Sequence, residues 1–448
     1  MDAADGSPTA RALRAAVRIP TVSSPDSRAV DLDALRELRD VLARHFPALW
    51  AEAGFELVSD SGGLLGFVAG ESSGEPVVLM GHQDVVPAED PAQWRHPPFE
   101  GVVADGFVHG RGTLDCKGTV IAICAAVERI LASGRRPSRD AWLSFGANEE
   151  VSGDAAQAAV DALVARGVEP WFVLDEGGAI VPDALPGLTS PLALIGVCEK
   201  GTTDVELVAT SPDAGHASTP PRMGATARLA RAILRLERRR APVSIPEPSL
   251  AMFEAAAPHA RGVFGWVYRN VRRLAWPFAR VLARLGPETE AVVRTTVAVT
   301  RLTGSSGRNV IANRATASAN LRVAVGETAA QAIARLRRTI ADGAVDVQVV
   351  DSNDPTPVAP LDHAGFRLLT AVTSSVLPGV VVAPYVMLGA SDARFFQRRW
   401  PAVYRFTPIR MDAALRATIH GVDERVAVAD LEDAVSWYEA LLTAKDPT

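Results

Sequence analysis

The sequence predicts an α/β fold in which a mostly parallel central sheet, covered by helices, is split by a smaller inserted α+β domain. Short apolar runs alternate with helical stretches over the first 200 residues, and this alternation returns after about residue 360. Between these regions the runs alternate polar and apolar residues, as strands with one solvent-exposed face do. Hydrophobic residues make up 48% of the 448 residues and charged residues 22%, which is typical of a globular protein.

The first region opens with a helix, because residues 30–54 have apolar positions at helical spacing and end at a glycine. The strands that follow are continuously apolar, so both faces of their sheet are expected to be buried. These strands cover residues 75–80, 141–145 and 171–174, and helices are expected over residues 118–132 and 154–166.

The inserted region is expected to be a layer of strands and two helices. Strands are predicted over residues 203–209, 315–323 and 344–350, and helices over residues 225–239 and 329–341. The α/β pattern then resumes with a helix over 364–377, a strand over 402–406 and a last helix near 430–444. We therefore assign residues 1–198 and 352–448 to the larger domain and residues 199–351 to the inserted one.

Residues 242–290 fit neither pattern. They carry six arginines and no acid between Arg261 and Pro287, and Pro277 should break any single helix there. We interpret the segment as a helical insertion docked on the inserted domain, with its arginines facing solvent. The less favoured alternative is contact of residues 261–284 with a membrane surface.

Charge and cysteine content narrow the classes of function. The formal net charge is −6, which is unfavourable for a nucleic-acid partner because phosphates need a positive surface. Three cysteines cannot form a disulfide framework, and neither a signal peptide nor an apolar stretch of 18 residues is apparent, so we expect a cytoplasmic protein. The chain has only three lysines (Lys117, Lys200 and Lys445), and a lysine retained against so many arginines is a candidate for a specific chemical role.

Residues of the types that bind metals follow several of the predicted strands. Because ligands bind at the carboxyl ends of strands in an open α/β sheet, these residues are expected to share one crevice. Two imidazoles with several carboxylates suit Zn²⁺ or a similar ion, and five or more ligands suggest two ions. Each residue alone would more often be a helix cap or part of a turn. The set consists of His82, Asp84, Asp115, Glu149, Glu150, Asp175 and His420.

The segments that carry these residues resemble the M20 family of zinc metallopeptidases. The shared motifs are GHQDVVP at 81–87, GRGTLDCKG at 110–118, NEE at 148–150 and DEG at 175–177. The resemblance extends over nearly the whole chain and is greatest to the branch that contains carboxypeptidase S and the N-acyl amino acid hydrolases. It implies that two Zn²⁺ ions are bound per chain, with Co²⁺ or Mn²⁺ as substitutes.

The same resemblance implies a division of ligands between the two ions. Asp115 would bridge both ions, His82 and Asp175 would bind one of them, and Glu150 and His420 would bind the other. The peptide bond after Asp115 is expected to be cis.

Two further acids are expected to act without binding metal. By resemblance to the family, Glu149 is the general base and Asp84 orients His82. The two neighbouring glutamates would point apart in an extended segment, so that one faces the metal and the other faces the substrate.

In the family the inserted domain, with a ferredoxin-like fold, is a lid that closes over the substrate. The resemblance implies that His216 helps to stabilise the oxyanion and that Arg322 binds the substrate carboxylate. The remaining residues expected to contact substrate are Asn309, Gly389, Ser391 and Arg394.

These observations predict a di-zinc hydrolase that cleaves an amide or peptide bond next to a free carboxylate. Its substrate would be a small peptide, as for a carboxypeptidase or dipeptidase, or an N-acyl amino acid. The alternative is a biosynthetic deacylase resembling acetylornithine deacetylase or succinyl-diaminopimelate desuccinylase. A non-catalytic binding protein is disfavoured, because the whole ligand set is present. The oligomeric state is left open between a monomer and a homodimer.

Overall fold

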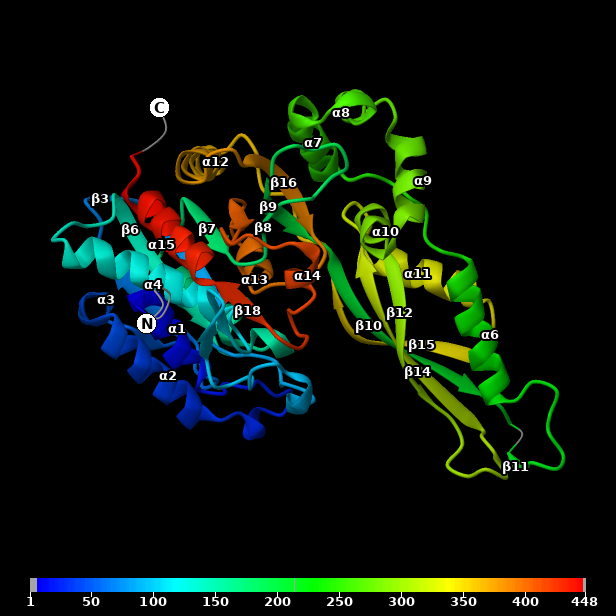
Figure 1. Cartoon of the computed structure of the whole chain (residues 1–448). Coiled ribbons are helices and arrows are strands. Elements are labelled where there is room, and N and C mark those ends of the chain that lie inside the picture. The colour runs from blue at the N-terminus through cyan, green and yellow to red at the C-terminus, as the bar shows by residue number, and fades with distance from the viewer. Residues whose placement is uncertain (1–5, 213, 446–448) are drawn as a thin grey trace.

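The computed structural model describes residues 6–212 and 214–445, and its strands form two main sheets (Figure 1). The larger sheet has the strand order β1-β2-β6-β3-β7-β17-β9-β16, with β8 paired to β9. Strands β6, β3, β7 and β17 are parallel, and so are β9 and β16, whereas the pairs β1–β2, β2–β6, β8–β9 and β9–β17 are antiparallel. The sheet is thus mixed, with a parallel centre. Its strands are β1 (Glu56–Leu57), β2 (Leu64–Val68), β3 (Ser72–His82), β6 (Arg139–Gly146), β7 (Phe172–Asp175), β8 (Ala179–Val181), β9 (Leu192–Glu199), β16 (Val381–Met387) and β17 (Val403–Arg405).

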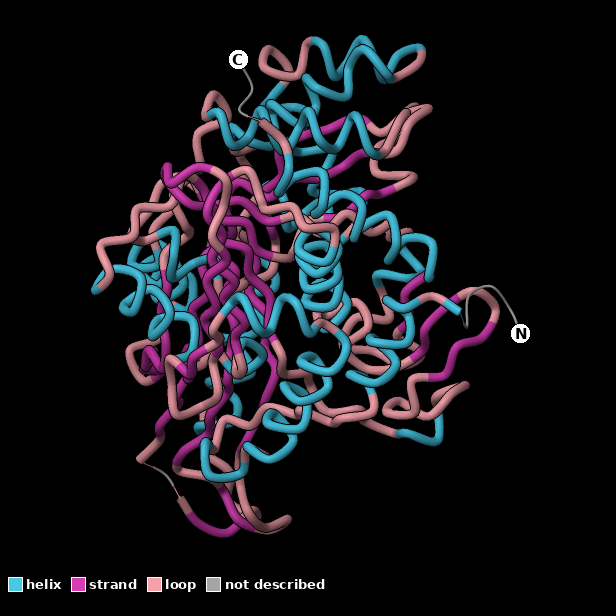
Figure 2. The backbone as a smooth tube through the Cα atoms, turned by 90° about the vertical axis from the view of Figure 1, so that its left-hand side faces the viewer, coloured by secondary structure: helices cyan, strands magenta, loops and turns pink. Residues whose placement is uncertain are grey.

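Both faces of this sheet are covered by helices, as the continuous apolar strands predict. Alternate residues of β3 enter different hydrophobic clusters, with Val77 and Leu79 on one face and Val78 and Met80 on the other. Figure 2 shows the strands as a band with helices to either side. One face is covered by α1 (Pro8–Val17), α2 (Leu32–His45), α3 (Pro47–Ala53), α4 (Lys117–Ala132), α12 (Ala364–Val376) and α15 (Val428–Thr443), and the other by α5 (Ala155–Ala165) and α13 (Ala393–Gln397).

The small sheet is formed by residues between 201 and 353 and is antiparallel throughout. Its strand order is β12-β14-β10-β15, built from β10 (Gly201–Thr210), β12 (Thr296–Thr303), β14 (Arg314–Val323) and β15 (Val345–Asn353). Alternate residues of β14, including Ala317, Ala319 and Leu321, pack under helices α6 (Ala225–Arg238) and α11 (Ala329–Ile340). A short pair, β11 (Gly215–His216) and β13 (Val310–Ile311), lies at the end of this sheet far from the larger one (Figure 1).

The insertion forms four helices, namely α7 (Glu247–Ala256), α8 (Gly262–Arg269), α9 (Ala275–Leu285) and α10 (Pro287–Val293). Pro277 lies in the first turn of α9, where a missing N–H breaks no helical hydrogen bond, so the break falls before it as predicted. The predicted docking site was wrong in part. The helices share a hydrophobic cluster with Ala383 of β16, so they pack on the larger sheet as well as beside the small one. No helix among the described residues is long and apolar enough to cross a bilayer.

A small three-stranded sheet joins distant segments of the chain. It pairs β18 (Arg425–Ala427) with β5 (Phe107–His109), and β5 with β4 (Val102–Ala104). His420 lies between a short helix, α14 (Ala413–Arg416), and β18. The pairing of β18 with β5 therefore brings the segment around His420 close to the loop that precedes α4. Short 3-10 turns occur at Ser27–Ala29, Pro91–Gln93, Glu149–Val151 and Ala257–His259.

Two of the three lysines are buried, and each holds the carboxyl end of a helix. Lys117 Nζ donates to the carbonyls of Ala16 and Ile19 at the end of α1, at 3.0 and 2.7 Å. Lys200 Nζ donates to the carbonyls of Ala291 and Arg294 at the end of α10, at 2.8 Å each. A cation is favourable there because the last carbonyls of a helix lack backbone donors.

Replacing Lys200 with methionine is expected to remove a pH dependence of stability. Burial, reinforced by Arg322, lowers the pKa of Lys200 from 10.5 to about 8. The unfolded chain therefore binds more protons than the folded one between these two pH values, so wild-type stability should rise with pH across that window. Urea unfolding at pH 8 and 10.5 should show the wild type gaining on the order of 3 kcal/mol relative to Lys200→Met. An equal pH response in both proteins would contradict this assignment.

Candidate metal centre

Three neighbouring strands of the larger sheet end at the same edge, and residues of metal-binding type follow each end. In the register of β3 and β6, His82 lies opposite Gly146, and β7 beside them ends at Asp175. The loop before α4 adds Asp115, and the segment after α14 adds His420. The residues of metal-binding type that the sequence singled out thus come from five separate parts of the chain.

Asp115 lies between the two histidines. His82 Nε2 is 2.9 Å from Asp115 Oδ1, and His420 Nε2 is 3.1 Å from Asp115 Oδ2. His420 Nε2 also lies 3.0 Å from Glu150 Oε2. Each carboxylate oxygen of Asp115 thus has its own imidazole, which is the arrangement expected of a residue shared by two ions. The peptide bond between Asp115 and Cys116 is cis, as the resemblance implies.

The donor set fits divalent cations. Burial would raise the pKa of Asp115, but hydrogen bonds from both histidines outweigh burial and lower it. Hydrogen bonds to Asp115 and Glu150 raise the pKa of His420 to about 10, so a proton on His420 supplies part of the positive charge that these acids attract. Glu150 Oε1 is buried without a hydrogen-bond partner, which leaves a free ligand atom facing the cluster. A divalent ion would satisfy both features.

Asp175 and Cys116 border this cluster. Asp175 is buried, and its two oxygens accept from the backbone amides of Glu176 and Ala393, at 2.9 and 2.8 Å. Cys116 Sγ accepts from the His82 amide at 3.0 Å, and burial raises the pKa of this thiol, which disfavours it as a metal ligand. Asp175 as a ligand therefore remains a prediction.

Asp84 organises the neighbours of the cluster. Its carboxylate accepts from the backbone amides of Glu149 and Glu150, at 3.2 and 3.1 Å. Asp84 Oδ1 lies 3.4 Å from His82 Nδ1, but the carbonyl oxygen of Asp84 is closer to that nitrogen, at 2.9 Å. Residue 84 can thus fix the tautomer of His82 through its backbone as well as its side chain.

Glu149 and Glu150 lie in a 3-10 turn rather than in the extended segment that the sequence suggested. Their side chains nevertheless have different neighbours. Glu150 contacts His420, whereas the charges of Asp392 and Asp115 act on Glu149. Burial, reinforced by these carboxylates, raises the pKa of Glu149 well above its ordinary value, as a general base requires.

Glu424 was missed at the sequence level, although it holds the loop that carries Asp115. Its side chain is fully buried. Oε2 accepts from Arg111 Nη1 at 2.6 Å and from the Gly112 amide at 3.0 Å, while Oε1 accepts from the amides of Leu114 and Asp115 at 2.8 and 3.2 Å. The one feature of the sequence that could have pointed to Glu424 is its position four residues after His420, a predicted metal ligand.

A second buried ion pair, between Glu199 and Arg405 at 3.1 Å, was also missed. Glu199 Oε2 accepts from the Ser391 amide at 2.8 Å, and Arg394 Nη1 donates to the Ser391 carbonyl at 2.9 Å. Ser391 and Arg394 are therefore buried within this network, whereas Gly389 in the same predicted substrate loop is exposed.

Three predicted substrate residues lie on the small sheet and not in the cluster. His216 and Asn309 are exposed beside each other near β11, where the amide of Ala217 donates to the Asn309 carbonyl at 2.9 Å. Arg322 is half-buried on β14, and its Nε donates to Asn320 Oδ1 at 3.1 Å. The structure does not bring these three residues to the metal-type ligands.

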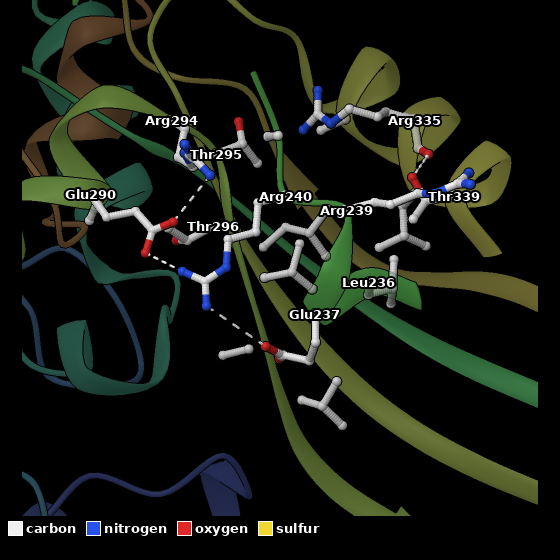
Figure 3. Close-up of a pocket in the computed structure, with 18 of the residues that line it drawn as sticks. Leu236, Glu237, Arg239, Arg240, Glu290, Arg294, Thr295, Thr296, Arg335 and Thr339 are labelled. Carbon is white, nitrogen blue, oxygen red and sulfur yellow. Dashed lines mark hydrogen bonds and ion pairs between the residues drawn. The ribbon is translucent and has the colours of Figure 1, made fainter. Parts of the chain in front are cut away.

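A cavity of about 520 Å³ lies on the helical side of the small sheet, between α6, α10, α11 and β12 (Figure 3). Glu290 pairs there with both Arg240 and Arg294, the latter at 3.2 Å. The pair with Arg240 links α10 to the segment that follows α6. The cavity shares no residue with the imidazole and carboxylate cluster, so we assign the chemistry to the cluster.

Comparisons with known proteins show what this chain is similar to. The sequence model described as peptidase family M20/M25/M40 matches residues 78–444. The N-fatty-acyl-amino acid synthase/hydrolase PM20D1.1 of Danio rerio is 35% identical over 443 residues, covering 97% of this chain and 85% of the relative. Probable carboxypeptidase S-like 2 of Dictyostelium discoideum is 32% identical over 379 residues, covering 83% of this chain and 72% of the relative.

Solved structures share the fold at low sequence identity. The M20 family metallo-carboxypeptidase Sso-CP2 from Sulfolobus solfataricus superposes with a TM-score of 0.72 at 15% identity, covering 99% of both chains. Human carnosine dipeptidase 1 superposes with a TM-score of 0.67 at 17% identity, covering 98% of this chain and 95% of the other.

Proposed function

The chain belongs to peptidase family M20/M25/M40 and is a metallohydrolase, and from this premise we propose that it cleaves N-acyl amino acids with two zinc ions. The observation that carries the proposal is the position of Asp115 between His82 and the pair formed by His420 and Glu150. Co²⁺ and Mn²⁺ are expected to substitute for zinc, because the donors are nitrogen and oxygen only.

The relatives favour an acyl amino acid over a dipeptide as the substrate. The N-fatty-acyl-amino acid synthase/hydrolases of Danio rerio and Homo sapiens are 35% and 33% identical over 443 residues. Carboxypeptidase S of Saccharomyces cerevisiae is more distant, at 25% identity. We therefore rank long-chain N-acyl amino acids first, dipeptides second, and the short acyl groups of the biosynthetic deacylases third.

The proposed mechanism assigns one task to each acidic residue. Divalent ions held by His82, Asp115, Asp175, Glu150 and His420 would polarise the amide carbonyl and lower the pKa of an attacking water. Glu149 accepts the proton of that water and passes it to the leaving amine. Asp84 keeps His82 in its ligand tautomer and holds the turn that carries Glu149.

We propose that residues 199–351 act as a lid on this site. His216 is exposed at the far end of the small sheet, so its role at the oxyanion needs the lid to move toward the metal ligands. Gly389, Ser391, Arg394 and Asn309 are proposed as the remaining substrate contacts, with Ser391 and Arg394 shaping the loop from within.

Metal removal is the first test of the proposal. A mass-spectrometric panel of N-acyl amino acids, dipeptides and N-succinyl amino acids should show hydrolysis that a chelator abolishes and added zinc restores. Release from the N-acyl amino acids should be the fastest. Hydrolysis that is unaffected after the metal content has fallen to zero would contradict the two-metal mechanism.

Substitution of Arg322 by alanine is expected to weaken the binding only of substrates that have a free carboxylate. A hydrogen-bonded ion pair with that group is worth about 1.5–3 kcal/mol, so KM should rise roughly 10–100-fold for the acid. The matching carboxamide, which offers no charge to the guanidinium, should change less than threefold. An equal loss on both substrates would remove Arg322 from carboxylate recognition.

A further inference from the structure

A second cavity, of about 670 Å³, lies between the helical insertion and the larger sheet. Its lining is mostly apolar and comes from both sides of that boundary. The insertion contributes Met252, Phe253, Leu282 and Val292, and the larger sheet and its loops contribute Leu194 and Leu388. The cavity is half open to solvent rather than an enclosed void, so a ligand could enter it from outside. Its volume falls within the range of ligand pockets.

Two walls of this cavity belong to segments that continue along the chain toward the proposed site. Leu388 closes one wall and is followed by Gly389, where the proposed substrate loop begins. The short helix Ala413–Arg416 forms another wall, and the chain reaches His420 four residues after Arg416. A ligand that fills the cavity therefore lies beside the segments that carry a metal ligand and the substrate loop.

The polar residues of the cavity are few, and one pair of them joins its two sides. Arg416 Nη2 donates to both oxygens of Glu288 at 3.0 Å, which links α14 to the insertion. Asp183 and Asp412 also line the cavity and are exposed. An apolar interior with a charged rim suits an amphiphile whose chain is buried and whose head group stays near water.

We propose that this cavity holds the acyl chain of the substrate, an inference that rests on the proposed function for the nature of the head group. The insertion then serves as a chain-length selector for the substrate. Each additional buried CH₂ should raise kcat/KM about fourfold until the cavity is full.

The test replaces Ala184, a half-buried alanine of the cavity wall, with tryptophan. The matched control is Ala324→Trp, at a half-buried alanine that follows β14 and lies outside the cavity. The substrates are N-acetyl-, N-octanoyl- and N-oleoyl-phenylalanine with the zinc-loaded protein. Ala184→Trp should lower kcat/KM for the oleoyl substrate at least tenfold and leave that for the acetyl substrate within twofold. An equal fall on both substrates, or no fall on the oleoyl one, would overturn the proposal.

Direct binding separates this proposal from the proposed function. Calorimetry with oleate should show binding to the wild type and to Ala324→Trp, and binding at least tenfold weaker to Ala184→Trp. If no substrate is hydrolysed but this pattern holds, the proposed function fails and the cavity assignment stands. If N-acyl amino acids are hydrolysed at one rate for all chain lengths and oleate does not bind, the cavity assignment fails alone.

A separate observation concerns the outer surface of the same insertion. Helices α8 and α9 expose six large apolar side chains, with between 41% and 66% of each accessible. Two neighbouring rows of side chains are exposed on α9. One row consists of Trp276, Arg280 and Arg284, and the other consists of Pro277, Val281 and Leu285. The inner face of α9 is also apolar, because Ala279 and Leu282 are buried. The exposed apolar residues are Val263, Phe264, Trp266, Trp276, Val281 and Leu285.

Charge decides what can cover this surface. Residues 261–286 carry six arginines and no acid. Arg272 pairs with Glu247 and Glu254, but the other five arginines keep the surface cationic, so two copies of it would repel one another. Arg280 stacks on Trp276 at 4.6 Å, which keeps an aromatic ring and a cation together at the surface. Tryptophan interleaved with arginine on a helix is the pattern that binds the interface of an anionic bilayer. We propose that α8 and α9 dock on an anionic lipid surface.

Vesicle co-sedimentation tests this second proposal with the full chain. Vesicles of phosphatidylcholine with 30% phosphatidylglycerol should bind the protein at least tenfold more tightly than vesicles of phosphatidylcholine alone. The double variant Arg280→Glu/Arg284→Glu should lose that preference. The control variant Arg301→Glu/Arg308→Glu, at exposed arginines of β12 and of the turn before β13, should keep it. Absence of wild-type binding to the anionic vesicles, or equal binding by both variants, would overturn it.

Discussion

Replacing Glu149 with glutamine is expected to lower kcat by about 10²–10⁴-fold while the bound metal is retained. The Glu149 side chain is buried among carboxylates that raise its pKa, so it binds a proton more readily than an ordinary glutamate. The reaction uses this property when Glu149 takes a proton from water and passes it to the leaving amine. Glutamine keeps the shape of the residue but cannot accept that proton. Steady-state kinetics combined with metal analysis by inductively coupled plasma mass spectrometry would measure both properties.

The neighbouring residue provides the matched control. Glu150 lies 3.0 Å from His420 and has an unpartnered buried oxygen, so Glu150→Gln should lose metal as well as activity. Near-normal turnover by Glu149→Gln would remove it from the role of base. Loss of metal by that variant would instead make Glu149 a ligand.

Replacing Glu424 with glutamine is expected to destabilise the protein by about 3–5 kcal/mol, the usual effect of breaking a buried ion pair. Each carboxylate oxygen of Glu424 accepts from two donors, so an amide nitrogen in place of either oxygen leaves two donors unpaired. Depending on its orientation, the amide would leave unpaired either Arg111 and the Gly112 amide or the amides of Leu114 and Asp115 before the cis bond. Urea unfolding of the metal-free protein would isolate this effect from the loss of metal.

An exposed ion pair sets the scale for that measurement. Glu169 pairs with Arg399 at 2.8 Å, with about half of each side chain in solvent. Glu169→Gln should change the free energy of unfolding by about 1 kcal/mol or less. If the two variants differ from the wild type equally, Glu424 contributes no more than a surface acid.

The residues of metal-binding type that the structure brings together were partly visible in the sequence, because several of them follow the end of an apolar strand. His82 ends an apolar strand, Glu150 follows one, and the parallel sheet brings such ends to one edge. Glu424 and Arg111 could not be paired in this way, because 313 residues separate them and neither lies in a periodic pattern. The partner of a single buried charged residue can be identified only once the fold is known.

The helical insertion illustrates a second limit. Its apolar spacing predicts helices with a buried stripe, but the stripe alone does not say which surface covers it. Contact with Ala383 of β16 depends on how the insertion folds back, and so does the cavity between the insertion and the larger sheet. The position of His216 likewise depends on the placement of one sheet relative to another, which no local pattern encodes.

The burial of Lys117 and Lys200 has a practical consequence for coupling chemistry. Both amines lie inside the fold, and Lys445, close to the carboxyl end, is exposed. Apart from the amino terminus of the chain, an amine-directed crosslinker or resin would therefore find a single lysine to react with. Immobilisation through lysine should therefore attach the protein through Lys445 and leave Lys117 and Lys200 unmodified.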